Sequence, residues 1–353
     1  MSSLSLETAR VAVQPVRIAI LGGNFGGKIA RSLDPLSDDV RIGGVCDLVQ
    51  AKSRALAEEL GVPVYDGLDA ILEDPEIEAV GVYTSPIGRG RLIERVLEAG
   101  KHVMTTKPFE LDPVAARAAY ETARRCKLAL HLNSPCPTPR ADLRRMREWL
   151  AEGSLGGAIS FQARTWADYR ERADGSWMDD PARCPAAPLF RLGVYFLNDF
   201  AALMGRPVEV FVLQSRVRTG RPTADNAQIS IRFENGSLGN VFTSFCVGDR
   251  RPYADEVDIV CEHGSIHRWM ERRGTIDMSH DRAVAELRRP GKAVDRIETA
   301  PGDFAGWYDW RGFRAAVRGE PGAVLQDAAA TLYGVELLAA VAESSRTGLP
   351  VRM

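Results

Sequence analysis

The alternation of short apolar runs with amphipathic stretches between residues 16 and 132 constrains the fold of this chain more than any other feature. Apolar runs of this kind are typical of strands buried on both faces of a parallel sheet. The pattern predicts strands at 16–21, 40–46, 79–83, 102–104 and 128–132, and helices at 25–33, 51–60, 91–99 and 113–125. Strands that alternate with helices form right-handed crossovers, so we expect a doubly wound parallel sheet of the Rossmann type.

The pattern changes after the proline-rich segment 134–139, which has the composition of a stiff hinge. Helices are predicted at 141–152 and near 193–204, and a last helix carries apolar residues at helical spacing between Leu325 and Ala342. Between these helices apolar and polar residues alternate, and Asn235-Gly236 is a strong hairpin signal, so we expect an α+β unit with a mostly antiparallel sheet. The length of 353 residues fits two domains, at 16–137 and 138–353.

The near balance of charges argues against a nucleic-acid partner. The formal net charge is −2 and the isoelectric point is near 6.3, whereas nucleic-acid-binding domains usually carry a basic excess. Arginine pairs at 144–145, 250–251 and 272–273 are either a phosphate-binding footprint or, as we favour, solvated surface balanced by acidic residues. We therefore expect a small-molecule substrate as the main partner.

The six cysteines form no close CxxC pair, which argues against a disulfide framework or a zinc site. His263 and His267 flank Gly264-Ser265, which has the composition of a hairpin turn, so we expect no metal site. The N-terminus lacks the basic start and apolar run of a signal peptide, and no stretch has the apolar length of a membrane span. These features predict a cytoplasmic protein with no membrane partner.

A glycine-rich turn follows the first predicted strand and leads into the first helix. Its residues are Gly22-Gly23-Asn24-Phe25-Gly26-Gly27. Gly22 and Gly27 match the GxGxxG spacing, whereas Asn24 occupies the middle glycine position, and such a turn brings a pyrophosphate to a helix N-terminus. Asp47, which ends the second strand, can accept hydrogen bonds from the adenosine ribose and would repel a 2′-phosphate. We therefore favour NAD without excluding NADP; the alternative is a tight turn beside a surface carboxylate.

Three further segments resemble conserved blocks of the glucose–fructose oxidoreductase / inositol dehydrogenase / rhizopine catabolism (Gfo/Idh/MocA) oxidoreductase family. They are AGKHVMTTKP at 99–108, similar to the family's "AGKHV…EKP", TSP at 84–86, similar to its "TP" loop, and RLGVYFLN at 191–198, similar to its "DxGxHxxD" helix. The resemblance covers the chain from Val16 onward. It implies a Rossmann domain followed by an open-sheet domain that binds substrate and assembles the protein into a homo-dimer or homo-tetramer.

The resemblance also implies roles for individual residues. It brings Lys107 beside the nicotinamide and the substrate hydroxyl, and it brings Thr84, Ser85, Pro86 and Pro108 to the cofactor, along with Phe25 of the glycine-rich turn. A lysine beside a reacting alcohol can bond to the hydroxyl and relay its proton if the lysine pKa is lowered. The alternative for Lys107 is an exposed lysine at a helix start.

Two residues depart from the family's catalytic pair. The family has Asp and His four positions apart on one helix face, whereas this chain has Arg191 and Tyr195. A phenol can still serve as a catalytic donor or acceptor at a carbinol oxygen, or Tyr195 is simply a packed aromatic. Arg191 cannot act as a base, so it either binds an anionic or carbonyl oxygen of the substrate, lowers the pKa of Tyr195, or forms a structural salt bridge. Trp177 either stacks on a sugar ring or is buried against the sheet.

We therefore predict an NAD(P)-dependent dehydrogenase or reductase that acts on CH–OH groups. It would transfer a hydride between nicotinamide and a secondary alcohol or ketone of a sugar, a cyclitol or a related ring. One alternative is a redox-neutral enzyme that uses bound NAD to eliminate or epimerise a sugar. The other is a non-catalytic NAD-binding regulator, against which the retained Lys107 argues.

Overall fold

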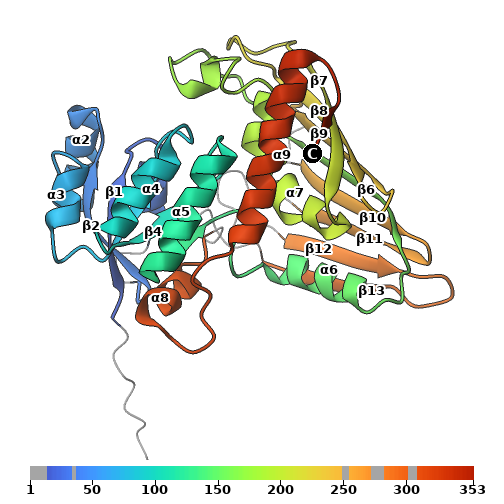
Figure 1. Cartoon of the computed structure of the whole chain (residues 1–353), viewed down its shortest axis with the longest axis horizontal. Helices are drawn as coiled ribbons and strands as arrows, with labels where there is room; N and C mark the ends of the chain where they lie inside the picture. The colour runs from blue at the N-terminus through green and yellow to red at the C-terminus, as the bar shows by residue number, and fades with distance from the viewer. Residues whose placement is uncertain (1–13, 34–36, 249–253, 272–281, 301–307) are drawn as a thin grey trace, which may run out of the picture.

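The structure consists of two units, each built on one sheet (Figure 1). It is a computed structural model, and it describes residues 14–33, 37–248, 254–271, 282–300 and 308–353. The first unit holds a five-stranded sheet and the second a nine-stranded sheet. The long C-terminal helix lies between them in the view of Figure 1.

The first unit is a doubly wound parallel sheet, as predicted. Its elements are β1 (Val16–Leu21), α1 (Phe25–Ser32), β2 (Val40–Cys46), α2 (Gln50–Leu60), α3 (Leu68–Glu73), β3 (Ala79–Val82), α4 (Arg89–Glu98), β4 (His102–Thr105), α5 (Pro113–Cys126) and β5 (Leu130–Leu132). The strand order is β2-β1-β3-β4-β5, and each neighbouring pair is parallel. The predicted strands and helices are confirmed with ends shifted by a few residues, while α3 is too short to show a helical period in the sequence.

Each face of this sheet carries its own apolar core. On one face the cluster includes Ile93 of α4 and Ala119 of α5, and on the other it includes Ile29 of α1 and Leu56 of α2. Helix α8 (Trp310–Arg318), from late in the chain, packs into the second of these cores through Phe313. The first unit is therefore completed by residues far beyond the proline-rich segment. Because all five strands are parallel, their carboxyl ends meet at one edge, where α/β proteins bind ligands.

The second unit contains the nine-stranded sheet and the helices that cover it. Its elements are α6 (Ala141–Ala151), β6 (Ala158–Trp166), η1 (Trp177–Asp179), η2 (Leu189–Gly193), α7 (Val194–Asp199), η3 (Ala201–Met204), β7 (Pro207–Ser215), β8 (Asn226–Phe233), β9 (Leu238–Ser244), β10 (Ala254–Cys261), β11 (Gly264–Glu271), β12 (Arg282–Arg288), β13 (Asp295–Thr299), α9 (Ala328–Thr347) and β14 (Val351–Arg352). The strand order is β13-β12-β11-β10-β6-β9-β8-β7-β14, antiparallel except for the β6–β9 pair. The predicted hairpin is present, with Gly236 at φ +84°. The single helix predicted near 193–204 is instead three short pieces, η2, α7 and η3.

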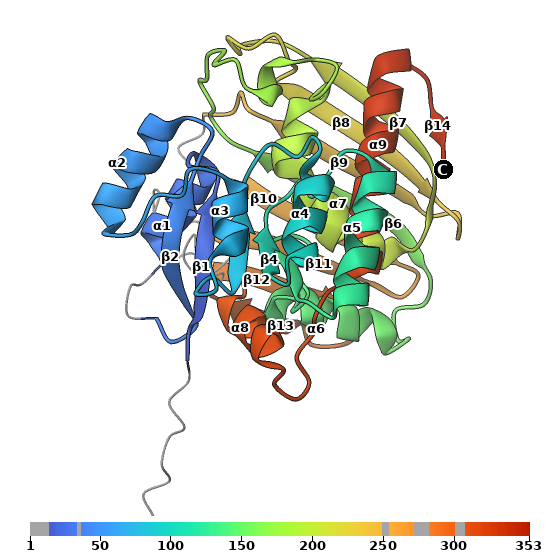
Figure 2. The same cartoon turned by 60° about the vertical axis from the view of Figure 1, so that its left-hand side comes forward.

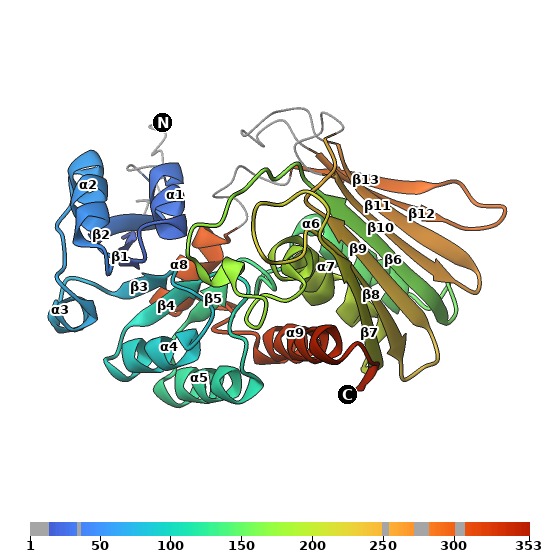
Figure 3. The same ribbon diagram turned by 90° about the horizontal axis from the view of Figure 1, so that it is seen from above.

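The large sheet has one covered face and one open face. Helices α6, α7 and α9 lie on the side that faces the first unit, and no helix of the described chain covers the other side (Figures 2 and 3). Apolar residues that alternate with buried neighbours are exposed on the open side: Leu238, Phe242 and Val260. In the part of the chain that the structure describes, no helix is long and apolar enough to cross a membrane.

The arginine pair at 144–145, which lies within the described residues, does not form a phosphate-binding site. Arg145 forms ion pairs with Glu148 and Asp295, and Arg144 is exposed. The pairs 250–251 and 272–273 lie outside the described residues. The interpretation of 144–145 as solvated surface therefore agrees with the structure.

Candidate functional site

The glycine-rich turn lies at the carboxyl edge of the parallel sheet, between β1 and α1. Gly22 has φ +106°, and its backbone N–H donates to the Cys46 carbonyl at 2.9 Å. A Cβ atom at Gly22 would lie 2.7 Å from the Tyr83 carbonyl oxygen. Both the left-handed backbone and the close approach of β3 therefore require glycine here. Without side chains in the way, the backbone of this turn can approach a pyrophosphate closely at the start of a helix.

Asn24, at the middle glycine position, turns its side chain away from this backbone. Its Oδ1 accepts a hydrogen bond from Lys52 Nζ of α2 at 3.0 Å, so the side chain does not cap α1, although Asn24 is the N-cap residue. The Phe25 ring packs edge-on against Tyr83, with centroids 6.1 Å apart. A helix N-terminus without a side-chain cap favours anionic ligands. The cradle at Gly22 and this helix start both fit a dinucleotide.

Asp47 fastens the end of β2 to the glycine-rich turn. Its Oδ2 accepts from the Gly23 amide at 2.6 Å, and its Oδ1 accepts from the Val49 amide at 2.8 Å. Each carboxylate oxygen has a further lone pair, so these bonds leave capacity for a ribose hydroxyl. The structure thus gives Asp47 a role in shaping the turn, and its contact with ribose stays a prediction.

The loops after β3 and β4 are neighbours because these two strands pair with each other. In the first loop, Ser85 Oγ accepts from the Ile87 amide at 3.3 Å, and Thr84 Oγ1 donates to the Ser85 carbonyl at 3.3 Å. The second loop carries Lys107 and Pro108. The predicted cofactor residues 84–86 and 107–108 therefore lie at the same edge as the glycine-rich turn.

Lys107, Tyr195 and Arg191 converge although they come from two units of the chain. Lys107 Nζ donates to the main-chain carbonyl of Arg191 and lies 4.5 Å from the centroid of the Tyr195 ring. Asn133, which follows β5, completes the cluster: its Oδ1 accepts from the Lys107 amide at 3.1 Å, and its Nδ2 donates to the Tyr195 hydroxyl at 3.2 Å. One amide side chain thus fixes the lysine backbone and the phenol together.

Burial sets the protonation states of this cluster. The pKa of Lys107 is lowered to about 7, first by burial and then by the positive charges of Arg191 and Arg89. Burial raises the pKa of Tyr195 well above its usual value. Near neutral pH the amine can therefore lose its proton, while the phenol keeps its own. The alternative in which Arg191 lowers the pKa of Tyr195 finds no support, because burial is the first cause of the raised phenol pKa, whereas the Arg191 charge is among the causes of the lowered Lys107 pKa.

The guanidinium of Arg191 pairs with Glu171. The Nη1–Oε2 and Nη2–Oε1 distances are 2.5 and 2.8 Å, and the guanidinium lies 4.8 Å from the ring centroids of Tyr169 and Phe245. This two-pronged geometry directly supports the structural salt bridge that the sequence left open. A contact between Arg191 and a substrate stays a prediction.

Trp177 is the first residue of η1. Acidic side chains of the loop around it form ion pairs with Arg221. The Arg221 side chain is only 6% exposed and pairs with Asp174 at 2.9 Å and with Asp179 at 2.5 Å. Trp177 is half-buried and packs on the core of the second unit. Its contact with a sugar ring stays a prediction. No sequence pattern indicates a role for Arg221 or Asn133, because their partners lie tens of residues away along the chain.

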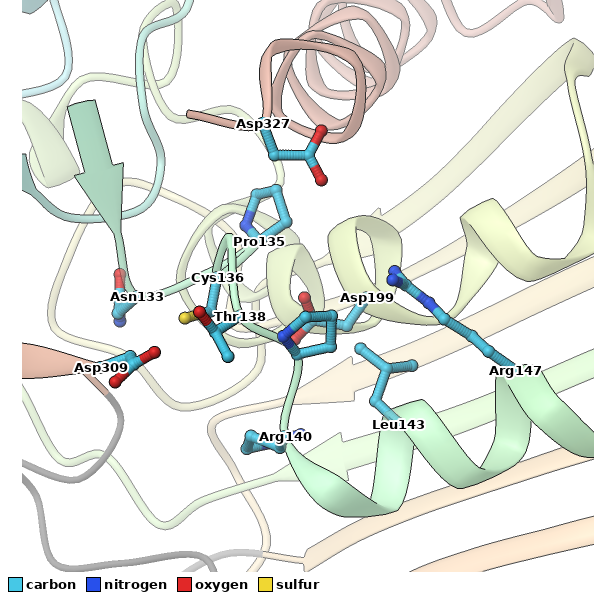
Figure 4. Close-up of a pocket in the computed structure, with 11 residues that line it drawn as sticks. Asn133, Pro135, Cys136, Thr138, Arg140, Leu143, Arg147, Asp199, Asp309 and Asp327 are labelled. Carbon is cyan, nitrogen blue, oxygen red and sulfur yellow. The ribbon is translucent and has the colours of Figure 1, made fainter. Parts of the chain in front are cut away.

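A small pocket of about 50 Å³ lies where the two units meet (Figure 4). Its carboxylates have structural tasks: Asp309 caps α8, Asp327 caps α9, and Asp199 accepts from Ser134 Oγ. Burial raises the pKa of Asp199 to about 6. Asn133 of the Lys107 cluster lines this pocket, but Lys107 and Tyr195 do not, and the pocket volume is too small for a sugar ring. We therefore assign the pocket to the joint between the units.

The histidine pair at 263 and 267 belongs to the β10–β11 hairpin. The turn falls at Glu262-His263, and Gly264 begins β11. His267 Nδ1 lies 2.6 Å from Asp258 Oδ1 across the strand pair. Among the residues that the structure describes, no three His, Cys, Asp or Glu side chains gather as metal ligands would.

Comparisons with known proteins agree with this geometry. Residues 16–134 match the family model described as an oxidoreductase family with an NAD-binding Rossmann fold, and residues 143–267 match the GFO/IDH/MocA C-terminal domain. The chain is 24% identical to the D-glucoside 3-dehydrogenase of Escherichia coli, with 96% of this chain and 98% of that protein covered. It is 24% identical to the scyllo-inositol 2-dehydrogenase (NAD(+)) of Bacillus subtilis, with 96% of each chain covered.

Two further matches complete these findings. An uncharacterized oxidoreductase of Schizosaccharomyces pombe is 29% identical over 161 residues, which are 45% of this chain and 43% of that protein. The structure of an inositol dehydrogenase homolog from Azotobacter vinelandii complexed with NAD+ has a TM-score of 0.78 and 20% identity, and covers 98% of this chain and 99% of that chain. The two family models adjoin along the chain in the same order as the two units of the structure. With its NAD-binding Rossmann unit followed by the open-sheet unit, this chain belongs to the Gfo/Idh/MocA oxidoreductase family.

Proposed function

We propose that this protein transfers a hydride between nicotinamide and a secondary alcohol or ketone on a sugar, a cyclitol or a related ring. The observation that carries this proposal is the Lys107 amine, which is enclosed between the Arg191 carbonyl and the Tyr195 ring and has a pKa of about 7. A buried amine with this pKa is suited to proton exchange with an alcohol near neutral pH. The sugar and cyclitol dehydrogenases among the relatives support the substrate class.

In the direction of oxidation, the neutral Lys107 amine accepts the hydroxyl proton of the substrate. The hydrogen on the same carbon leaves as a hydride, the C–O bond becomes a carbonyl, and Lys107 ends as an ammonium. The nicotinamide supplies the hydride acceptor when it is bound. The Tyr195 phenol, which keeps its proton, donates to the substrate oxygen, and Asn133 holds the phenol and the Lys107 backbone in place.

We propose NAD as the preferred cofactor, bound along residues 22–27, Asp47 and 84–86. Asp47 supports this preference, because its carboxylate at the end of β2 would repel a 2′-phosphate. We also propose a homo-dimer or homo-tetramer formed through the open sheet face, where Leu238 and Phe242 are exposed. The free thiols of all six cysteines support a reducing, cytoplasmic location.

The test is an activity panel of cyclitols, sugars and glycosides with NAD and, separately, NADP. Nicotinamide absorbance reports reduction, and mass spectrometry reports products. The Lys107→Met variant removes the proton acceptor, and Lys292→Met on an exposed turn is the matched control. Reduction that depends on Lys107 but not on Lys292 would support the proposal. Product without net nicotinamide change would indicate a redox-neutral cycle, and nucleotide binding without any product would indicate a regulator.

A further inference from the structure

Two buried, oppositely charged side chains join the loops that follow β3 and β4. Arg89 is the first residue of α4, just after the 84–86 loop, and Glu110 lies between Lys107 and α5. Each residue is only 2% exposed. Buried charges are costly unless hydrogen bonds satisfy them, so the partners of these two residues show what they hold.

Arg89 reaches across to the loop that carries Lys107. Its Nη1 donates to the carbonyl oxygens of Thr106 at 2.6 Å, of Pro108, and of Phe109 at 3.3 Å. Its Nη2 donates back to the Thr84 carbonyl in its own loop. The guanidinium therefore grips the main chain on both sides of Lys107 and ties it to the loop after β3.

Glu110 makes the reverse connection. Its Oε2 accepts from the Gly90 amide at 2.8 Å, and its Oε1 accepts from the Gly88 amide at 3.4 Å, both at the start of α4. Oε1 also accepts from the Leu111 amide at 2.7 Å in its own loop. The Glu110 carboxylate thus accepts from backbone amides at the start of α4, the helix that Arg89 begins. In return, the Arg89 guanidinium donates to backbone carbonyls of the loop that carries Glu110.

We propose that Arg89 and Glu110 form a reciprocal clamp that positions Lys107 and the 84–86 loop against one another for cofactor binding and hydride transfer. This inference rests on the proposed function for the role of Lys107. Asn133 fixes the Lys107 amide, so the clamp at Thr106 and Pro108 completes the restraint on the lysine main chain. With the main chain of Lys107 restrained, the hydrogen bond from its amine to the Arg191 carbonyl fixes the side chain.

A planar guanidinium is required at this position. Arg89 bonds four carbonyls that lie in different directions, whereas the single ammonium of a lysine has three donors at one point. Arg89 also acts on Lys107 by charge. The charges of Arg191 of η2 and Arg89 of α4 lower the lysine pKa, the Cys184 thiol acts in the opposite direction, and the Tyr195 ring of α7 lies against the amine. The clamp therefore acts on both the position and the protonation of the amine.

The experiment compares Arg89→Ala, Arg89→Lys and Glu110→Gln with the full-length protein and with Arg91→Ala, an exposed arginine on the same helix. NADH fluorescence gives the dissociation constant of each variant, thermal unfolding shows whether it folds, and steady-state rates across pH give kcat and the apparent pKa. Added guanidinium ion serves as the chemical rescue of Arg89→Ala.

We expect Arg89→Ala to lower kcat by about 100-fold, as a misplacement of about 1 Å does, and to raise the NADH Kd by at least about tenfold. Added guanidinium ion should partly restore both the kcat and the NADH Kd of Arg89→Ala. The apparent pKa of the pH profile of Arg89→Ala should be higher than that of the wild type. Arg89→Lys should lose kcat while its profile stays near that of the wild type, because it keeps the charge. Arg91→Ala should change none of these quantities.

A folded Arg89→Ala protein with wild-type kcat, NADH Kd and pH profile would overturn the clamp. If Arg89→Ala does not fold, the kcat, NADH Kd and pH profile of Glu110→Gln and Arg89→Lys test the clamp instead. If the wild type binds NADH but turns over no substrate in the panel, the proposed function fails. The clamp is then judged on NADH binding alone, and equal Kd values for Arg89→Lys, Glu110→Gln and Arg91→Ala would refute it.

Discussion

Replacing Lys107 with Met should make the protein more stable near neutral pH while it removes the proton acceptor. The pKa of Lys107 is lowered from 10.5 to about 7, first by burial. Each pKa unit corresponds to about 1.4 kcal/mol, so a protonated Lys107 costs the folded state roughly 5 kcal/mol. Methionine fills a similar volume without a charge, but it leaves the Arg191 carbonyl without its donor, which costs about 1–3 kcal/mol. We expect a net gain of roughly 2–4 kcal/mol at about pH 6.5.

The dependence on pH follows from the direction of the shift. The folded-state pKa lies below the unfolded-state pKa, so the unfolded chain binds the proton more tightly between about pH 7 and about pH 10.5. The wild type therefore becomes more stable as pH rises through this window, and the cost of the lysine is complete below it. From about pH 6.5 to about pH 9.5 the advantage of Lys107→Met should shrink by about 3 kcal/mol, to near zero.

Urea unfolding at several pH values measures this difference for the wild type, Lys107→Met and the control Lys292→Met. The control should track the wild type at every pH, because Lys292 is exposed on the β12–β13 turn. Turnover of Lys107→Met should fall by about 100- to 10 000-fold, the range for a lost general base. A variant that is less stable than the wild type by the same amount at all pH values would refute the burial argument. It would mean that Lys107 is an ordinary solvated lysine.

Three further outcomes follow from the site. In steady-state assays of alcohol oxidation, kcat/KM should rise with pH through about 7 and then level off, because the neutral Lys107 amine is the reactive form; a flat profile would exclude it as the base. Gly22→Ala should lower the unfolding free energy by at least about 1 kcal/mol and abolish NAD binding in calorimetry, because its Cβ would strike the Tyr83 carbonyl; unchanged binding would contradict the cradle. Asp47→Ser should weaken NAD and strengthen NADP by about tenfold each in KM, and an unchanged ratio would remove Asp47 from cofactor selection.

The first sheet was predictable because each strand is buried on both faces and so reads as one apolar run. Val16–Leu21 and Ala79–Val82 have this character, and glycine ends the first run where the backbone must turn. Strands of the second sheet are harder to find, because β13 alternates half-buried and exposed residues with little apolar content. The packing of Phe313 from α8 into a core of the first sheet could not be predicted, because no local pattern encodes a shared core with Ile29 nearly three hundred residues earlier.

The candidate site was predicted where it depends on chain geometry and missed where it depends on side-chain partners. Gly22, Lys107 and Tyr195 follow from the turn and from the family blocks. Asn133 and the Arg89–Glu110 pair carry no such signal, because each acts through backbone groups of another segment. Arginine and glutamate are also common on exposed helix starts, so only burial in the structure separates these two from ordinary surface charges.

Arg191 gives this site a charge opposite to that of the family's aspartate. An aspartate beside a lysine would stabilise the ammonium and raise the pKa of the amine, whereas the guanidinium of Arg191 lowers it. Glu171 neutralises the arginine, so the ion pair adds little net charge to the second unit. The amine can therefore act as a base without a carboxylate behind it.

Replacing Arg191 and Glu171 together by Gln should test this idea with the overall charge unchanged. The Arg191 carbonyl stays in place, so the bond to the Lys107 amine is retained while the nearby positive charge is lost. We expect the apparent pKa of the kcat/KM profile to rise by about one unit, so that the rate at neutral pH falls while the plateau at higher pH is kept. A profile that keeps its midpoint, with a lower plateau, would mean that Arg191 acts on the substrate or on the fold of the loop and not on the proton of Lys107.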